Sequence, residues 1–182
     1  MSVPPIEVNA ADVELYADRE VLRMALKSLD RRALVVLALR AAKRVSVFID
    51  LRVATTEAVA AGLSGTSQES LYTFADTVSH YAASAALDGM DAAGEASWAA
   101  DFAANAPRFT DPVVWKATSL DLWRLYHLTT LTGGPPLTGW DDPRLGPLWP
   151  DGVPEWHTAA EREVRDLRER LANRPNPFAP KS

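Results

Sequence analysis

DRRALVVLALRAAKRVSVF, residues Asp30 to Phe48, is the stretch of sequence that decides the fold. Its large apolar side chains repeat every three or four residues, which is the spacing of an α-helix with one buried face. Asp30 is a residue type that caps helix N-termini, because its carboxylate accepts a hydrogen bond from an amide of the first turn. Further apolar residues widen the stripe, so we expect this helix to be the central one. The stripe consists of Leu34, Leu37, Ala38, Ala41, Val45 and Phe48.

The same kind of sequence continues to Asn105, with alanine at close intervals and Gly, Ser, Thr or Asp at the breaks. Alanine is the best helix former, and its small side chain lets two helices approach closely. Thr66 with Glu69 forms a capping box, and Thr110-Asp111-Pro112 is a strong start signal for a helix. The expected helices cover approximately residues 10–29, 31–48, 56–62, 67–87, 92–106, 112–131 and 155–172.

The segment from Thr132 to Pro154 differs from the rest, because it is rich in proline and glycine and has no period. Proline restricts the backbone and lacks an amide donor, which is unfavourable in a helix interior. Trp140 and Trp149 supply large apolar side chains that can fix such a segment to the bundle. We therefore expect an ordered loop here, followed by an amphipathic helix. The apolar stripe of that helix consists of Trp156, Ala160, Val164, Leu167 and Leu171.

The expected architecture is therefore an all-α, single-domain bundle of about six to seven helices. The domain covers residues 1–174, with the loop at 132–154 and the C-terminal helix at 155–172. Residues 175–182 are expected to form an extended or frayed tail.

Composition excludes several classes of protein. The apolar fraction of 47% and the charged fraction of 24% are ordinary for a globular protein, and a net charge of -5 disfavours general binding of nucleic acid. The absence of cysteine excludes disulfides, thiolate catalysis and cysteine-ligated metals. The N-terminus lacks a signal-peptide pattern, and the most apolar run, Ala33 to Ala42, is too short to span a membrane. We expect a cytoplasmic protein without a cofactor.

Two of the three histidines enter a metal-site hypothesis. Asp76 and His80 share one face of a helix, and His127 on another long helix could meet them across a core. The Glu-x-x-His pairs of di-iron bundles are missing, because Thr77 and Arg124 occupy the positions three residues before these histidines. We therefore expect no metal site and keep a small metal-dependent helical-bundle enzyme as an alternative.

The stretch from Thr55 to Phe74 suggests a second alternative. Thr55 or Thr56 is expected to start a short helix that Gly62 ends, and the stretch resembles the helix-turn-helix of TetR-type repressors. Gln68 stands where an apolar packing residue belongs in that motif, and the second helix lacks basic residues for DNA phosphates. A ligand-responsive transcription regulator remains an alternative.

Two groups of residues are candidates for binding another protein. Acidic residues in and after an inter-helix turn suit a basic partner if they gather on one face. Tryptophans in or beside the proline-rich loop either pin it to the bundle or form a binding hot spot. The candidate residues are Asp88, Asp91, Glu95, Trp140, Trp149 and Trp156.

Two further expectations concern charged and aromatic side chains. The basic residues of the central region have a spacing that scatters them around a helix, so we expect a solvated rim. They are Arg31, Arg32, Arg40, Lys43, Arg44 and Arg52. Three tryptophans within expected helices, Trp98, Trp115 and Trp123, are predicted to lie in the core.

Three runs, LDRRAL (Leu29–Leu34), LALRAAKRV (Leu37–Val45) and TEAVAAGL (Thr56–Leu63), occur in this order. Together they resemble a group of alanine-rich helical bacterial proteins, some of which are classed as immunity proteins of polymorphic toxin systems. The resemblance covers about residues 29–104 and implies no site residues, since the group has no motif tied to a mechanism. The cysteines that those proteins often carry in the first helix are absent here.

The leading function is therefore a non-catalytic cytoplasmic protein that binds another protein and neutralises a toxin as an immunity protein does. The expected partner is a protein, and a basic one would suit the acidic residues; neither nucleic acid nor a membrane is expected. A homo-oligomer through the stripe from Trp156 to Leu171 is a further hypothesis, since the sequence does not separate it from packing within one chain.

Overall fold

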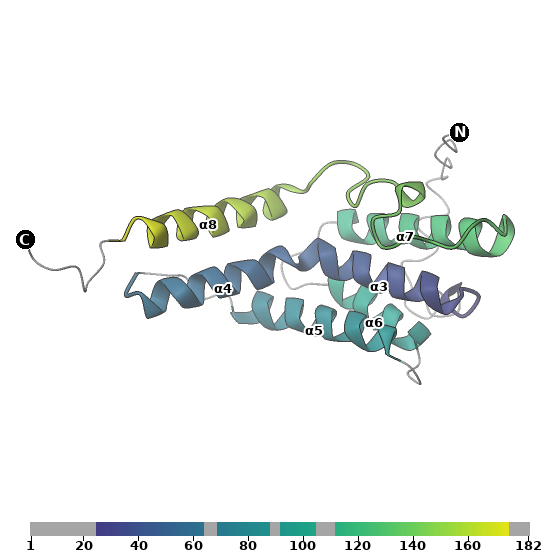
Figure 1. Ribbon diagram of the computed structural model, residues 1–182, viewed down its shortest axis with the longest axis horizontal. Coiled ribbons are helices and arrows are strands. Elements are labelled where there is room, and N and C mark those ends of the chain that lie inside the picture. The colour runs from purple at the N-terminus through teal and green to yellow at the C-terminus, as the bar shows by residue number, and fades with distance from the viewer. Residues whose placement is uncertain (1–24, 64–68, 88–91, 105–111, 175–182) are drawn as a thin grey trace, which may run out of the picture.

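The computed structural model describes residues 25–63, 69–87, 92–104 and 112–174, and over these ranges it contains helices and no strand. The predicted all-α bundle is therefore confirmed (Figure 1). Of the first expected helix, residues 10–29, the part up to residue 24 lies outside the described residues, and so does the tail after Arg174. The elements are α3 (Arg31–Val45), α4 (Val47–Ala60), α5 (Glu69–Ala86), α6 (Ala92–Ala104), α7 (Pro112–Tyr126), the π-helix η2 (His127–Leu131), the 3-10 helix η3 (Pro143–Leu145) and α8 (Glu155–Ala172).

Helix α3 is central, as predicted. Asp30 caps it, with its carboxylate accepting a hydrogen bond of 2.8 Å from the Ala33 amide. In Figure 1, α5 and α6 lie on one side of α3 and α7 lies on the other. The residues of the predicted stripe are all buried, and other helices pack on α3 from both sides. This helix therefore joins the two halves of the core.

Helices α3 and α4 follow each other almost in line, with a break at Ser46 (Figure 1). The expected helix to Phe48 therefore ends early, and the expected start at Thr55 or Thr56 is wrong, because α4 begins at Val47 and continues through both threonines. Threonine is tolerated in this helix since each hydroxyl has a partner. The Thr56 hydroxyl donates to the Arg52 carbonyl, and the buried Thr55 hydroxyl lies 3.3 Å from the Tyr72 hydroxyl.

Gly62 ends α4, as predicted. Its φ of 73° is left-handed, and the Leu63 amide donates to the Ala58 carbonyl while the Gly62 amide donates to the Val59 carbonyl. These two bonds form a Schellman motif, which satisfies carbonyls that the helix itself leaves unpaired.

Alanine brings α6 close to the other helices, as its density in the sequence predicts. α6 contacts α3, α5 and α7, and its inner face is built from alanines that are fully buried. The buried alanines of this face are Ala96, Ala99, Ala100 and Ala103. The capping residue expected for α5, Thr66, lies outside the described residues.

Helix α7 begins at Pro112, and its path reaches Leu131 through the π-helix η2, as expected from the sequence. Thr132 caps the C-terminal end of η2. Its hydroxyl is within donor distance of the carbonyls of His127 (3.1 Å) and Leu128 (3.2 Å). The chain then enters the loop from Thr132 to Pro154, which contains η3.

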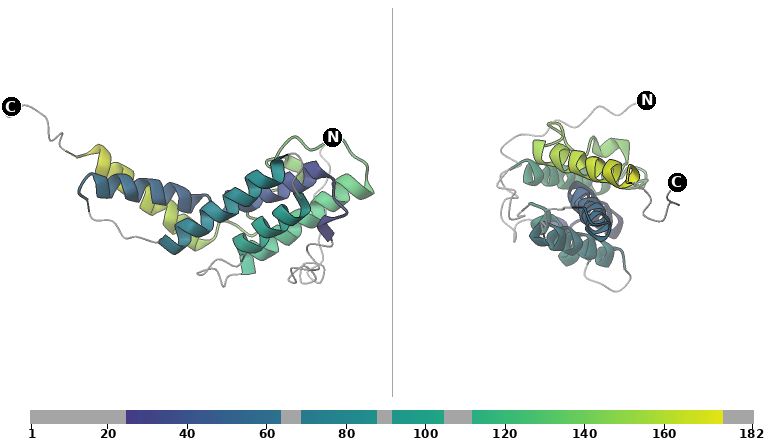
Figure 2. Two further views of the ribbon diagram at one scale, coloured as in Figure 1. Left: turned by 90° about the horizontal axis from the view of Figure 1, so that it is seen from below. Right: turned by 90° about the vertical axis from the view of Figure 1, so that its left-hand side faces the viewer.

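Helix α8 packs on α4, and the two form an arm that extends beyond the other helices (Figures 1 and 2). The predicted stripe of α8 faces this contact, with Ala160, Val164 and Leu167 buried. Trp156 stacks on Phe48 of α4 with ring centroids 5.7 Å apart. In the described ranges, none of the helices combines the length and the apolar character needed to cross a membrane.

Candidate functional site

The loop from Thr132 to Pro154 is held to the bundle by three arginines and one aspartate, which we call the loop clamp. Arg40 and Arg44 come from α3, one helical turn apart, and Asp121 and Arg124 come from α7. Arg40, Arg44 and Asp121 are almost completely buried, with 1%, 0% and 1% of their surface exposed. Such burial of charge is rare unless each group is paired.

Arg40 binds three carbonyls of the loop. Its guanidinium donates to the carbonyls of Trp140 (2.9 Å), Gly146 (3.3 Å) and Pro147 (2.9 Å). Its Nε lies 2.9 Å from Asp121 Oδ2, although the approach is too oblique for a hydrogen bond, so the attraction there is one of charge. One side chain thus fixes the middle of the loop at two separate places.

Arg44 links the loop to α7. It donates to the Leu148 carbonyl from Nε (3.2 Å) and Nη2 (3.0 Å), and its Nη1 lies 3.5 Å from the Thr118 hydroxyl. Nη2 also donates to Asp121 Oδ2 at 2.5 Å. Arg124 adds a further bond to the Leu145 carbonyl. Carbonyls that proline-rich backbone cannot pair internally are therefore satisfied by arginine donors.

The electrostatics of the clamp are unbalanced, since three cations face one carboxylate. Burial lowers the pKa of Arg44, and the charge of Asp121 and its hydrogen bond oppose that shift. Burial also lowers the pKa of Arg124, again opposed by Asp121. Arginine is effectively always protonated in proteins, so Arg44 and Arg124 are treated as cations at neutral pH. Asp121 thus makes the burial of the two α3 arginines tolerable.

Asp142 and Arg144 organise the outer part of the loop. The buried Asp142 carboxylate accepts from the Thr138 amide (2.9 Å), the Arg144 amide (3.0 Å) and the Arg144 guanidinium (2.7 and 2.9 Å). The Arg144 hydrogen bonds hold the pKa of Asp142 far below its ordinary value. Arg144 also donates to the carbonyls of Pro135 (2.8 Å) and Pro136 (3.1 Å), so it ties together both ends of this turn.

The tryptophans of this region fix the loop, which is one of the two interpretations of the sequence. Trp149 is buried, with 7% of its surface exposed, and contacts Trp156 edge-on at 5.6 Å. Arg44 lies over the Trp149 ring, 5.8 Å from its centroid. Trp140 is half-buried, with the Lys43 ammonium 5.2 Å from its centroid. Trp149 and Trp156 are therefore anchors, and Trp140 is half-buried beside Lys43.

His157 completes this aromatic cluster at the start of α8. Its ring centroid lies 5.6 Å from that of Trp149 and 5.6 Å from that of Trp156. Its Nδ1 has no hydrogen-bond partner and lies 3.6 Å from Glu161. Burial lowers the pKa of His157, and the nearby Glu161 carboxylate partly opposes the shift.

The acidic candidates are only partly described. Asp88 and Asp91 lie outside the described residues. Glu95 is half-buried in the first turn of α6, where its Oε2 is buried without a hydrogen-bond partner. The described residues therefore give no support to an acidic binding face at this turn.

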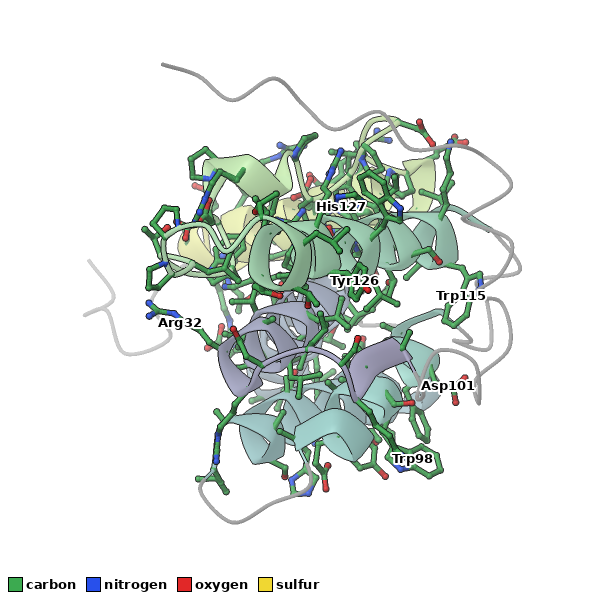
Figure 3. The ribbon with its side chains drawn as sticks, turned by 90° about the vertical axis from the view of Figure 1, so that its right-hand side faces the viewer. Arg32, Trp98, Asp101, Trp115, Tyr126 and His127 are labelled. Carbon is green, nitrogen blue, oxygen red and sulfur yellow. The ribbon has the colours of Figure 1, made fainter. Side chains whose placement is uncertain are left out.

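The alternative metal site is not formed. Asp76 is half-exposed and pairs with Arg52, and its neighbour His80 is exposed on α5. His127 lies on the far side of α3, where its ring packs 3.8 Å from Trp123 (Figures 1 and 3). Among the residues that the structure describes, no group of three or more His, Cys, Asp or Glu side chains could hold a metal ion.

Two expectations about side chains are wrong. Arg40 and Arg44 do not belong to a solvated rim, because the loop covers them and Asp121 neutralises them. Trp98 is not a core residue, since 36% of its surface is exposed and it points outward from α6 (Figure 3). It rests against Tyr81, with centroids 5.7 Å apart, so α5 buries only one side of it. Trp115 and Trp123 are half-buried.

The sequence contains a signal for the loop clamp. Arg40 lies inside the most apolar run, and Arg44 follows it on the same face of the helix. Asp121 occupies the inner face of α7, between the buried residues Ala117 and Leu125. Opposite charges on the apolar faces of two helices indicate a buried ion pair.

Comparisons with protein-family models, with curated proteins and with solved structures each found no match.

Proposed function

We propose that this chain is a non-catalytic protein-binding module whose contact surface is the clamped loop. The observation that carries the proposal is the fixing of an irregular loop by buried arginines. Loops of this length without regular structure are usually functional or disordered. Here the donors of Arg40 and Arg44 hold the backbone in one arrangement.

Such a loop is well suited to binding because its ordering has already been completed during folding. A partner that docks on a flexible segment must also restrict it, which weakens binding. The clamp removes this cost. The burial of three charged groups under the loop is hard to explain by stability alone, since apolar residues of similar volume often serve at least as well.

The surface offered to a partner is built from proline and tryptophan. Trp140 is half-buried, so part of its ring is open to a partner, and Lys43 beside it is exposed. The exposed prolines of the loop are Pro135, Pro136, Pro143 and Pro147. Proline and tryptophan offer apolar area with little rotamer entropy to lose, which suits a binding hot spot.

A cytoplasmic location and a toxin as the partner belong to the same proposal. Their support is the resemblance of residues 29–104 to helical proteins that include immunity proteins, together with the net charge of -5. The regulator alternative has less support, because α4 begins at Val47 instead of forming a short helix from Thr55. The metal-dependent alternative has less support, because its three residues are not brought together.

The test is capture of a partner from the native host, followed by measurement of its affinity for purified variants. Trp140→Ala is expected to weaken binding by about tenfold or more, because a hot-spot tryptophan contributes over 1.4 kcal/mol. Trp98→Ala is the matched control, since Trp98 is an exposed tryptophan on α6, away from the loop. Equal affinities for wild type and Trp140→Ala would overturn the proposal, and so would enzymatic turnover by the purified protein.

A further inference from the structure

Helix α4 carries apolar side chains on two opposite faces. One face packs inside the molecule and includes the buried residues Phe48, Leu51 and Ala58. The other face is open, with Val53 48% exposed and Ala60 exposed. Figure 2 shows α8 and α5 on neighbouring sides of α4 and no described helix over its remaining side. Burying Val53 and Ala60 against another surface would remove apolar area from water, which favours association at this face.

The open face has the spacing of a coiled-coil seam. Ile49, Val53, Thr56 and Ala60 follow each other at intervals of four, three and four residues, as core positions of successive heptads do. Of these, Ile49 is half-buried and packs partly against the core, whereas the other three are exposed. Thr56 fits a seam because its hydroxyl already donates to the Arg52 carbonyl, at 2.9 Å, and its methyl group remains for packing. The side chains are small, which allows a second helix to approach closely.

The charges beside the seam identify the partner as a second copy. Arg52 lies on one flank, and Asp50 and Glu57 lie on the other. In a parallel pair of identical helices, a residue on one flank faces the residue five positions later on the opposite flank of the partner. Arg52 then faces Glu57 of the second copy, twice by symmetry. An antiparallel pair would instead bring the acidic flanks of both copies together.

Arg52 can make this contact without losing its present one. Its Nη1 binds Asp76 of α5, and a guanidinium has five donors, so others remain for a second carboxylate. Its side chain is 44% exposed.

We propose that the open face of α4 joins two copies of this chain through a parallel α4–α4 contact. This interface is independent of the loop surface. It also replaces the self-association through α8 that the sequence suggested, because the stripe of α8 is already buried against α4.

The first test is the oligomeric state of the full chain, measured by sedimentation equilibrium over a wide range of concentrations. Wild type is expected to dimerise, and Val53→Glu is expected to raise the dimer dissociation constant by about tenfold or more, because a carboxylate would be buried in the seam. Val153→Glu is the matched control, since Val153 is 53% exposed on the loop. A wild type that is monomeric throughout overturns the proposal, as does a dimer that Val53→Glu leaves unchanged.

The second test uses charge to establish the parallel pairing. Arg52→Glu and Glu57→Arg each place like charges opposite one another in a homodimer, so each variant alone is expected to dimerise more weakly than wild type. A mixture of the two restores opposite charges at both contacts, and a heterodimer should form. Circular dichroism confirms that each variant is folded. If the mixture associates no better than its components, the proposed pairing is wrong.

Discussion

Asp121 is the residue on which the burial of the loop clamp depends. Its Oδ2 atom lies 2.9 Å from Arg40 Nε and 2.5 Å from Arg44 Nη2, and both arginines are out of contact with water. Taking a cation out of water is costly unless a charge or hydrogen bonds replace the solvent. The loop carbonyls supply the hydrogen bonds, and Asp121 supplies the compensating charge.

Replacing Asp121 with asparagine keeps the shape and removes the charge. We expect Asp121→Asn to lower the free energy of unfolding by about 3–5 kcal/mol, as when one partner of a buried ion pair is removed. Urea denaturation measures the change. Asp141→Asn, at an exposed position within the loop, is the control and should stay within about 0.5 kcal/mol of wild type. Equal stability of both variants would contradict this role for Asp121.

His157 gives the molecule a pH dependence with a definite sign. Burial lowers its pKa in the folded state, so the folded protein resists protonation at a pH where the unfolded chain accepts it. The contribution of His157 is therefore fully present above the unfolded pKa, near 6.5, and is lost as the pH falls below it.

The test compares wild type with His157→Gln. We expect the urea midpoint of wild type to fall between about pH 7 and pH 5, and we expect a smaller fall for the variant. Carboxylates that titrate in the same range affect both proteins, so the difference between the two curves isolates His157. If the urea midpoints of wild type and His157→Gln fall equally with pH, His157 is not the titrating group.

At the scale of the elements, local signals account for where most helices begin and end. Asp30 caps α3 and Gly62 ends α4, each by hydrogen bonds within a few residues of the chain, and α7 begins at Pro112, as the sequence predicts. The start of α4 is the exception. Thr55 and Thr56 look like a start in sequence, but their hydroxyls bind Tyr72 and the Arg52 carbonyl, so the helix continues through them.

Gly62 provides a test of this local control. A side chain at its φ of 73° is strained, so Gly62→Ala should destabilise the protein by about 1 kcal/mol. The cause is the backbone, since an added Cβ would meet only Arg174, at 4.0 Å. Gly134→Ala is the control. Gly134 does not have a left-handed φ, and a Cβ there would make ordinary contacts of 3.6 Å or more, so little change is expected in thermal denaturation.

At the scale of the whole molecule, the clamp makes the loop part of the core. Its charged partners are distant in sequence: Arg44 and Asp121 are 77 residues apart, and Arg40 binds carbonyls 100 or more residues away. The loop is therefore expected to be ordered together with α3 and α7 and to lose its order when Arg40 is replaced.

Hydrogen exchange can measure that coupling. In Arg40→Met, we expect faster amide exchange in the loop from Trp140 to Leu148, because three carbonyl contacts are lost, and unchanged exchange in α5. Arg32→Met, at an exposed position in the first turn of α3, is the control. Exchange that stays slow in the loop of Arg40→Met would show that Arg44, Arg124 and the tryptophans hold the loop without Arg40, and would contradict the role given to Arg40.

The sequence by itself determined the helical class, the central place of α3, the Asp30 cap, the end of α4 at Gly62 and the ordered proline-rich loop before α8. These features depend on the period of apolar residues and on contacts within a few residues of the chain, and both can be read from the sequence alone. Only the tertiary structure decided that Arg40 and Arg44 are buried, that Trp98 is exposed, and that Asp76 and His80 are separated from His127. Whether a charge or an aromatic ring is covered depends on which distant segment packs against its helix. The spacing of Arg40 and Arg44 along one helix does not show that both will be covered by Asp121 and by a loop 100 residues away.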